Sequence, residues 1–208
     1  LSMMMTTASV RAGTILDFED VLAEHGADTP FFTPIETQAF TLTATNPPTG
    51  FSSGFQVYGP GAGNYAGEIG VTTFAPASSP PDNLIELTKS DGTSFDLTSI
   101  DLARNFAFDP APTVLFIGTK TDGSTVEQSF TVTVPVGTPE FQRFLFSGFD
   151  DVVSVTWGQP QLSEGLHQFS HIVIGAVVPE PSAIALMTLS TPLIFACAAR
   201  RRCFGKRD

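Results

Sequence analysis

The chain has 208 residues and a formal net charge of −11, from 10 basic and 21 acidic residues. Residues 13–178 hold four basic against 19 acidic residues, a net charge of −15, and this acidity excludes a nucleic-acid-binding protein. With 42% hydrophobic residues the chain is not a disordered acidic polymer, and its length allows one domain of moderate size.

The first twelve residues, LSMMMTTASVRA, are predicted to be the remnant of a signal peptide. Val10 and Ala12 put an aliphatic and a small residue where signal peptidase requires them, which predicts cleavage before Gly13. We therefore expect a folded extracytoplasmic domain at residues 13–177.

Short runs in which apolar and polar residues alternate, separated by turn residues, fill this domain and predict strands. A single helical turn is expected at residues 21–25. The predicted strands are 14–19, 39–45, 55–58, 70–74, 84–89, 95–97, 100–102, 114–120, 125–134, 144–149, 152–158 and 167–177. About ten short strands without a long helix predict an all-β fold, an antiparallel β-sandwich of jelly-roll-like type.

Local residue chemistry adds detail to this expectation. Asp91-Gly92 and Asp122-Gly123 stand between alternating runs and predict two hairpins. The side-chain parity changes between residues 95–97 and 100–102, which predicts a β-bulge at Thr98-Ser99. Residues 59–70 and 75–83 have the Gly- and Pro-rich composition of loops.

Candidate ligand-binding residues lie in the first of these loops, where Tyr65 stands with Asn64 and Glu68. An exposed ring beside amide and carboxylate groups suits a sugar, whereas Trp157 shares its parity with Val153 and Val155 and is expected in the core.

The histidines do not indicate a metal pair. On a regular strand His167 and His171 would lie about 13 Å apart, too far to ligate one ion.

Paired carboxylates keep a second class of function open, a hydrolase with two acids across a cleft. The pairs in the chain are Asp17 with Glu19, Asp96 with Asp101, and Asp150 with Asp151. The domain has no cysteine and no G-x-S-x-G motif, so a thiol or serine nucleophile is not indicated.

The C-terminal segment has three ordered parts. Val178-Pro179-Glu180-Pro181-Ser182 comes first, and 17 uncharged residues, 183–199, follow it. They would reach about 25 Å as a helix, which predicts a single short transmembrane helix. Arg200, Arg201 and Arg202 then begin a basic tail, residues 200–208, which by the positive-inside rule stays cytoplasmic and places the acidic domain outside.

These three parts together resemble the PEP-CTERM sorting signal of bacterial exported proteins, a segment also known as an ice-binding protein C-terminal domain. The resemblance covers residues 178–208 and implies export through the inner membrane and transient anchoring by the helix. It also implies processing near the motif by an exosortase, followed by a place at the cell surface or outside the cell. The scattered threonines offer no regularly spaced face for ice.

Residues 95–103, 118–130, 146–157 and 167–175 resemble the lectin-like jelly-roll domains that PEP-CTERM proteins often carry. This likeness implies a fold akin to carbohydrate-binding modules. It also implies a structural calcium ion, with Asp17 or Glu19 as ligand, although Ser170 stands after Phe169 where the related pattern has Asp. No other cofactor is indicated.

Two hypotheses follow from the sequence. The first is an exported, non-catalytic surface or matrix protein that is sorted by its tail and binds an extracellular polysaccharide. The alternative is a secreted carbohydrate-active hydrolase that uses a carboxylate pair.

Overall fold

The structure, a computed structural model, describes residues 13–27, 33–45, 54–73, 84–106, 110–134, 140–159 and 165–175. The chain divides into two compact units, Leu1–Ala176 and Val177–Asp208, and every described residue belongs to the first. The expected signal-peptide remnant, the loop at 75–83 and the sorting segment at 178–208 lie outside the described residues.

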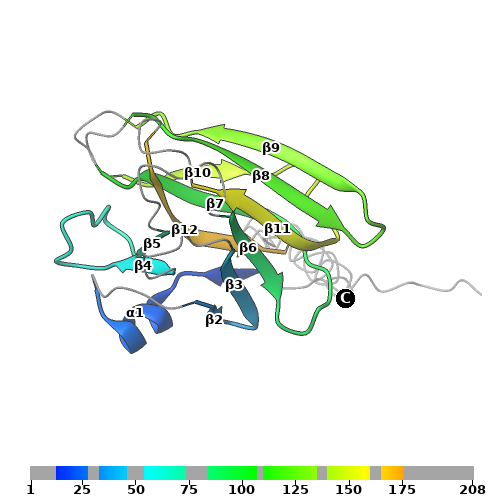
Figure 1. Ribbon diagram of the computed structural model, residues 1–208, viewed down its shortest axis with the longest axis horizontal. Helices are drawn as coiled ribbons and strands as arrows, with labels where there is room; N and C mark the ends of the chain where they lie inside the picture. The colour runs from blue at the N-terminus through cyan, green and yellow to red at the C-terminus, as the bar shows by residue number, and fades with distance from the viewer. Residues whose placement is uncertain are drawn as a thin grey trace, which may run out of the picture. The chain divides into compact units, whose positions relative to one another are not determined.

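Two antiparallel sheets form the described domain (Figure 1). The first has the strand order β10 (Gln142–Leu145), β7 (Leu97–Arg104), β12 (His167–Ile174), β5 (Gly70–Thr73) and β4 (Phe55–Tyr58), and β1 (Thr14–Leu16) also pairs with β12. The second has the order β2 (Ile35–Thr37), β3 (Phe40–Thr45), β6 (Leu84–Lys89), β11 (Val152–Gly158), β8 (Thr113–Lys120) and β9 (Thr125–Thr131). The predicted all-β, antiparallel two-sheet class is confirmed.

Aromatic rings join the two sheets through one core. Trp157 of β11 is 2% exposed, as predicted, and its ring centroid lies 5.4 Å from Phe116 of β8. Its ring centroid also lies 5.3 Å from that of Phe169, which belongs to β12 in the first sheet. Phe130 of β9 stacks on Phe144 of β10 at 4.8 Å and makes a second contact across the sheets. Because aromatic rings carry large apolar areas, they account for much of the core of a domain that has no cysteine.

The first predicted strand is shorter than expected. β1 ends at Leu16, and α1 (Glu19–His25) begins three residues later, so Asp17 and Glu19 do not lie on a strand. The chain turns at Phe18, which adopts a left-handed φ of 62° and whose ring is fully buried against Phe169 at 5.8 Å. Burial of this ring offsets the conformational cost of the left-handed residue, a tertiary effect that alternation along the sequence does not reveal.

The bulge predicted at Thr98-Ser99 is confirmed by the pairing of β7 with β12. Val173 pairs with Ser99 and Ile174 pairs with Leu97, so β7 contains one residue, Thr98, more than β12 over this step. The extra residue lets Leu97 and Ile100 both face the core, which explains the parity change in the sequence.

The two Asp-Gly turns share their local geometry but not their role. In each the glycine N–H donates to the lysine carbonyl three residues earlier, and the Asp carboxylate accepts from the N–H two residues later. Asp122-Gly123 joins the paired strands β8 and β9, so that hairpin is confirmed. Asp91-Gly92 instead leads from β6 in the second sheet to β7 in the first, so the predicted hairpin there is wrong. The turn itself is formed, since the Thr93 N–H and hydroxyl both donate to the Asp91 carboxylate, and these hydrogen bonds lower the pKa of Asp91 to about 2.

Candidate functional site

The candidate site begins on the outer face of the first sheet. Ile100 and Leu102 of β7 face the core, so Asp101 between them faces away from the second sheet. Arg143 of β10 is its register partner and grips it with a two-pronged ion pair, Nε to Oδ1 at 2.8 Å and Nη2 to Oδ2 at 2.7 Å. The same hydrogen bonds raise the pKa of Arg143, and the Asp101 side chain is only 5% exposed.

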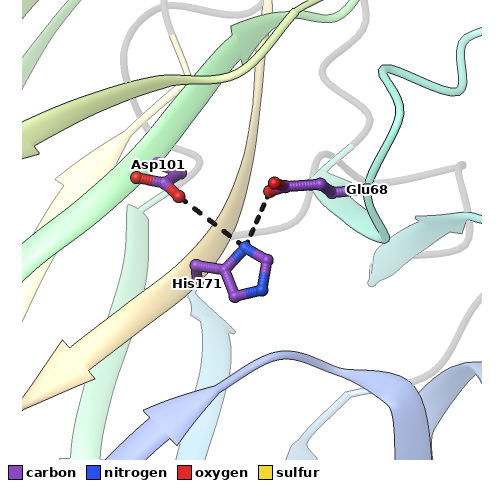
Figure 2. A group of neighbouring side chains, drawn as sticks. All are labelled: Glu68, Asp101 and His171. Atoms are coloured by element: carbon purple, nitrogen blue, oxygen red, sulfur yellow. Dashed lines mark hydrogen bonds and ion pairs between the residues drawn. The ribbon is translucent and has the colours of Figure 1, made fainter.

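A histidine stands between this aspartate and a glutamate of the loop between β4 and β5. His171 Nδ1 lies 2.7 Å from Glu68 Oε2 and 3.6 Å from Asp101 Oδ2. Figure 2 shows that both carboxylates point toward the same ring nitrogen. The side chains of Glu68 and His171 are 43% and 29% exposed, so the cluster opens to solvent on the glutamate side.

An irregularity in β12 places His171 in this position. Ser170 pairs with Asp101 and Val173 pairs with Ser99, so β12 holds one residue more than β7 over this step. His171 has a left-handed φ of 38°, and Ile172 after it returns to the core. Bulges of this kind redirect a side chain, and here the redirected group is an imidazole that meets two carboxylates.

A cavity of about 340 Å³ lies beside the cluster. Its lining combines carboxylates, one histidine, one aromatic ring and apolar groups, and we call it the acidic cavity: Asp17, Glu19, Leu22, Pro60, Tyr65, Gly67, Glu68, Ile69 and His171. Residues from the two separate sequence predictions, for a ligand and for calcium, thus line one cavity.

Not all of the predicted ligand-binding residues line the acidic cavity. Tyr65 is half-buried, and its hydroxyl donates a hydrogen bond of 2.7 Å to the carbonyl of Gly67. Asn64 does not line the acidic cavity; its main-chain carbonyl accepts a hydrogen bond from Gln168 Nε2. Asp17 and Glu19 enter from the turn before α1 rather than from a strand, and Asp17 Oδ1 accepts the main-chain N–H of Glu19.

The remaining carboxylate pairs are engaged elsewhere. Asp150 lies 3.2 Å from Lys120, and Asp151 accepts from the Thr121 hydroxyl at the end of the β8–β9 hairpin. Asp96 accepts the main-chain N–H of Asp151, while Asp101 is held by Arg143. Asp96, Asp150 and Asp151 therefore form contacts away from the site, whereas Asp101 belongs to the cluster with Glu68 and His171. Of the predicted pairs, only Asp17 and Glu19 line the acidic cavity.

His167 and His171 differ in their surroundings. His167 is fully buried, and its ring nitrogens have no hydrogen-bond partner among the described residues. Burial lowers its pKa to about 3. His167 is therefore a neutral core residue, and only His171 of the two belongs to the site.

Another cavity, of about 360 Å³, lies between α1 and β2 and is lined by Val21, Glu24, His25, Pro34, Ile35 and Glu36. None of the sequence-predicted site residues lines it. The acidic cavity is therefore the better candidate, because it joins the predicted residues to the Glu68–His171–Asp101 cluster.

Within the part of the chain that the structure describes, no helix is both long and apolar enough to cross a membrane. The predicted helix at residues 183–199 and the Arg200–Arg202 cluster lie outside that part.

No protein-family model matches the chain, and a search of curated proteins finds no match. Among solved structures it is similar to the K2 adhesin domain of Lys-gingipain, over 79% of this chain and 98% of that one, at 13% identity and a TM-score of 0.46. It is also similar to CBM29_1, a family 29 carbohydrate-binding module from Piromyces equi, over 78% and 89%, at 9% identity and a TM-score of 0.41. A third likeness, to an exo-beta-agarase, covers 25% of that chain at a TM-score of 0.43. At these values the likenesses identify neither a family nor a ligand, so the fold class rests on the strand order.

Proposed function

We propose that the protein is an exported, non-catalytic surface or matrix protein whose β-sandwich binds a polysaccharide in the acidic cavity. The observation that carries the binding proposal is the convergence of the Tyr65 ring with the carboxylates of Glu68, Asp17 and Glu19 in one cavity. Sugar rings present apolar C–H faces and hydroxyl edges, and these groups match an aromatic ring and carboxylate acceptors.

The charge of the acidic cavity restricts the class of polysaccharide. Three carboxylates line it, and Arg143 beyond His171 is already paired with Asp101. Anionic chains such as uronates would meet like charge and lose solvation without compensation. We therefore propose neutral, hydroxyl-rich glycans as the ligand class.

The glycan proposal predicts a specific role for the Tyr65 ring. Tyr65→Ala is expected to weaken binding of a neutral polysaccharide about tenfold, which corresponds to roughly 1.4 kcal/mol. Tyr65→Phe should weaken it less, because the ring stays and only the hydroxyl bonded to the Gly67 carbonyl is removed. Isothermal titration with soluble neutral oligosaccharides and affinity electrophoresis measure both effects.

The matched control is Leu115→Ala, which truncates a 46%-exposed side chain on β8 of the other sheet. It should leave glycan affinity unchanged. Equal affinity of wild type and Tyr65→Ala would contradict the proposed site, and release of new reducing ends during the titration would favour the hydrolase alternative instead.

The sorting part of the proposal is supported by the order of motif, apolar segment and arginine cluster at residues 178–202. Proline restricts φ to about −65° and lacks an N–H, so a sequence with proline on both sides of Glu180 is unfavourable for a helix or a central strand. Such an extended segment at the edge of a bilayer suits recognition by a processing enzyme of the exosortase type, while Arg200–Arg202 keep the tail cytoplasmic.

Replacing Pro179, Glu180 and Pro181 together with alanine is expected to abolish processing, so that full-length precursor accumulates in the membrane fraction. Immunoblots of membrane and surface fractions measure this outcome. The control replaces Lys206, Arg207 and Asp208 with alanine and should be processed normally, because the three arginines remain. Normal surface release of the motif variant would disprove the sorting proposal.

A further inference from the structure

We propose that Glu68, Asp101 and His171 form a binding site for a divalent first-row transition-metal ion. The three residues come from the β4–β5 loop, β7 and β12, and one ligand atom of each lies within 4.8 Å of the others. This inference is separate from glycan binding, although Glu68 and His171 also line the acidic cavity.

His171 Nδ1 faces two carboxylate oxygens, and a single proton on this nitrogen can form a hydrogen bond with only one of them. The nitrogen faces Glu68 Oε2 at 2.7 Å and Asp101 Oδ2 at 3.6 Å, as Figure 2 shows. A proton on Nδ1 satisfies the glutamate alone, because 3.6 Å is too long for a hydrogen bond. A metal ion in place of that proton would bind the nitrogen and both carboxylates at once.

A fourth polar group lies on the same face. Ser170 is the register partner of Asp101, and directly opposed residues of an antiparallel pair direct their side chains to one face of the sheet. Its hydroxyl is fully buried and has no hydrogen-bond partner among the described residues. A buried unpartnered hydroxyl is unusual, and here it stands beside both Asp101 and His171.

Charge at the cluster favours a cation despite the neighbouring arginine. Arg143 takes one position on each Asp101 oxygen, and an ionised carboxylate has about four acceptor positions, so Asp101 retains the capacity to bind a metal. With His171 neutral, Glu68, Asp101 and Arg143 sum to −1, and Asp17 and Glu19 in the same cavity add two further negative charges.

The donor set selects the class of metal. One imidazole with two carboxylates suits zinc, nickel, cobalt or manganese, whereas calcium takes six to eight oxygen ligands and magnesium prefers oxygen and water. The site therefore differs from the calcium ion expected from Asp17 or Glu19, both in its ligands and in its metal.

The test is an isothermal titration calorimetry experiment in which Zn²⁺ is added to the full-length protein after treatment with a chelator. The protein used carries serine in place of Cys197 and Cys203. This double substitution removes the only thiols of the chain as competing ligands. One ion should bind per chain, and Glu68→Gln or His171→Asn should each weaken binding about tenfold or more. Cobalt(II) added instead should develop a visible absorption band that His171→Asn changes, because the band reports the nitrogen ligand.

Glu68→Gln alters a 43%-exposed side chain and should leave the fold intact, which the far-UV circular dichroism spectrum checks. The matched control is His25→Asn, which removes a histidine that lies 3.7 Å from Glu24 in α1 and should leave affinity unchanged. Calcium should not compete with zinc. Unchanged zinc affinity in folded Glu68→Gln and His171→Asn proteins, or a loss of binding in His25→Asn, would overturn the proposal.

Discussion

Trp157→Ala is expected to lower the free energy of unfolding by about 3–5 kcal/mol, the range for deleting a large aromatic side chain from a packed core. Trp157 is 2% exposed on β11, and its ring contacts Phe116 of β8 and Phe169 of β12. Its removal therefore deletes contacts with a neighbouring strand of the same sheet and with the opposite sheet, and leaves a cavity in the core. Small domains have a free energy of unfolding of only about 5–15 kcal/mol, so this loss would be a large fraction of the stability of the domain.

Trp157→Phe is the matched control. It keeps an aromatic ring between Phe116 and Phe169 and removes the indole N–H, which has no hydrogen-bond partner among the described residues. We expect a smaller loss, about 1–2 kcal/mol, because only part of the bicyclic ring is removed and the cavity left is smaller than in Trp157→Ala. Urea-unfolding curves measure both changes, and equal losses in the two variants would show that the ring does not hold the sheets together.

Strands whose alternation reflects one buried face were predictable from the sequence. The strands at 84–89 and 114–120 were predicted, and in the structure the alternate residues Ile85, Leu87, Val114 and Phe116 of β6 and β8 are buried. The bulge at Thr98 was predictable for the same reason, because a change of parity is a local signal.

Features decided by distant contacts were not predictable. Asp91-Gly92 and Asp122-Gly123 form nearly the same turn, since the Asp side chain bonds its own neighbouring main chain, yet one turn joins paired strands and the other crosses between sheets. Turn chemistry fixes the reversal of the chain but not the partner strand. The short β2 at Ile35–Thr37 escaped prediction because three residues give too little alternation to detect.

The residues of the candidate site also differ in whether local sequence could indicate them. Tyr65 and Glu68 could be selected from loop composition, and both line the acidic cavity. Asp101 and His171 are 70 positions apart and meet only because β7 pairs with β12 and because β12 bulges at this point. His171 carried a weak signal as one of three histidines, but its partner on another strand could not be inferred without the strand order.

The second large effect we expect is a loss of stability in mild acid that depends on His167. Its ring is fully buried, and its register partner on β7 is the cation Arg104. The main chain at His167 is held firmly, because Gln159 Oε1 accepts its N–H while its carbonyl accepts from Gln159 Nε2 and the Thr72 hydroxyl. The ring therefore cannot easily move to solvent when it gains a proton.

Burial lowers the pKa of His167 from 6.5 to about 3 in the folded protein. Between these two pH values the unfolded chain binds a proton that the folded chain does not, so stability falls as the pH falls. The contribution is complete above pH 6.5 and decreases by about 1.4 kcal/mol per pH unit below it. At two units below 6.5 the expected loss is about 2.7 kcal/mol, and it levels off near pH 3.

Urea unfolding at a series of pH values between 7 and 4 measures this slope. His167→Leu puts an apolar side chain of similar size in place of the imidazole and should remove the part of the slope that is due to one proton. The plots of unfolding free energy against pH for wild type and variant should therefore converge or cross as the pH falls. His25→Gln, a change at a histidine with a 28%-exposed side chain in α1, should retain the wild-type slope. A wild-type slope that persists in His167→Leu would show that another group takes up the proton, and it would contradict the role assigned to His167.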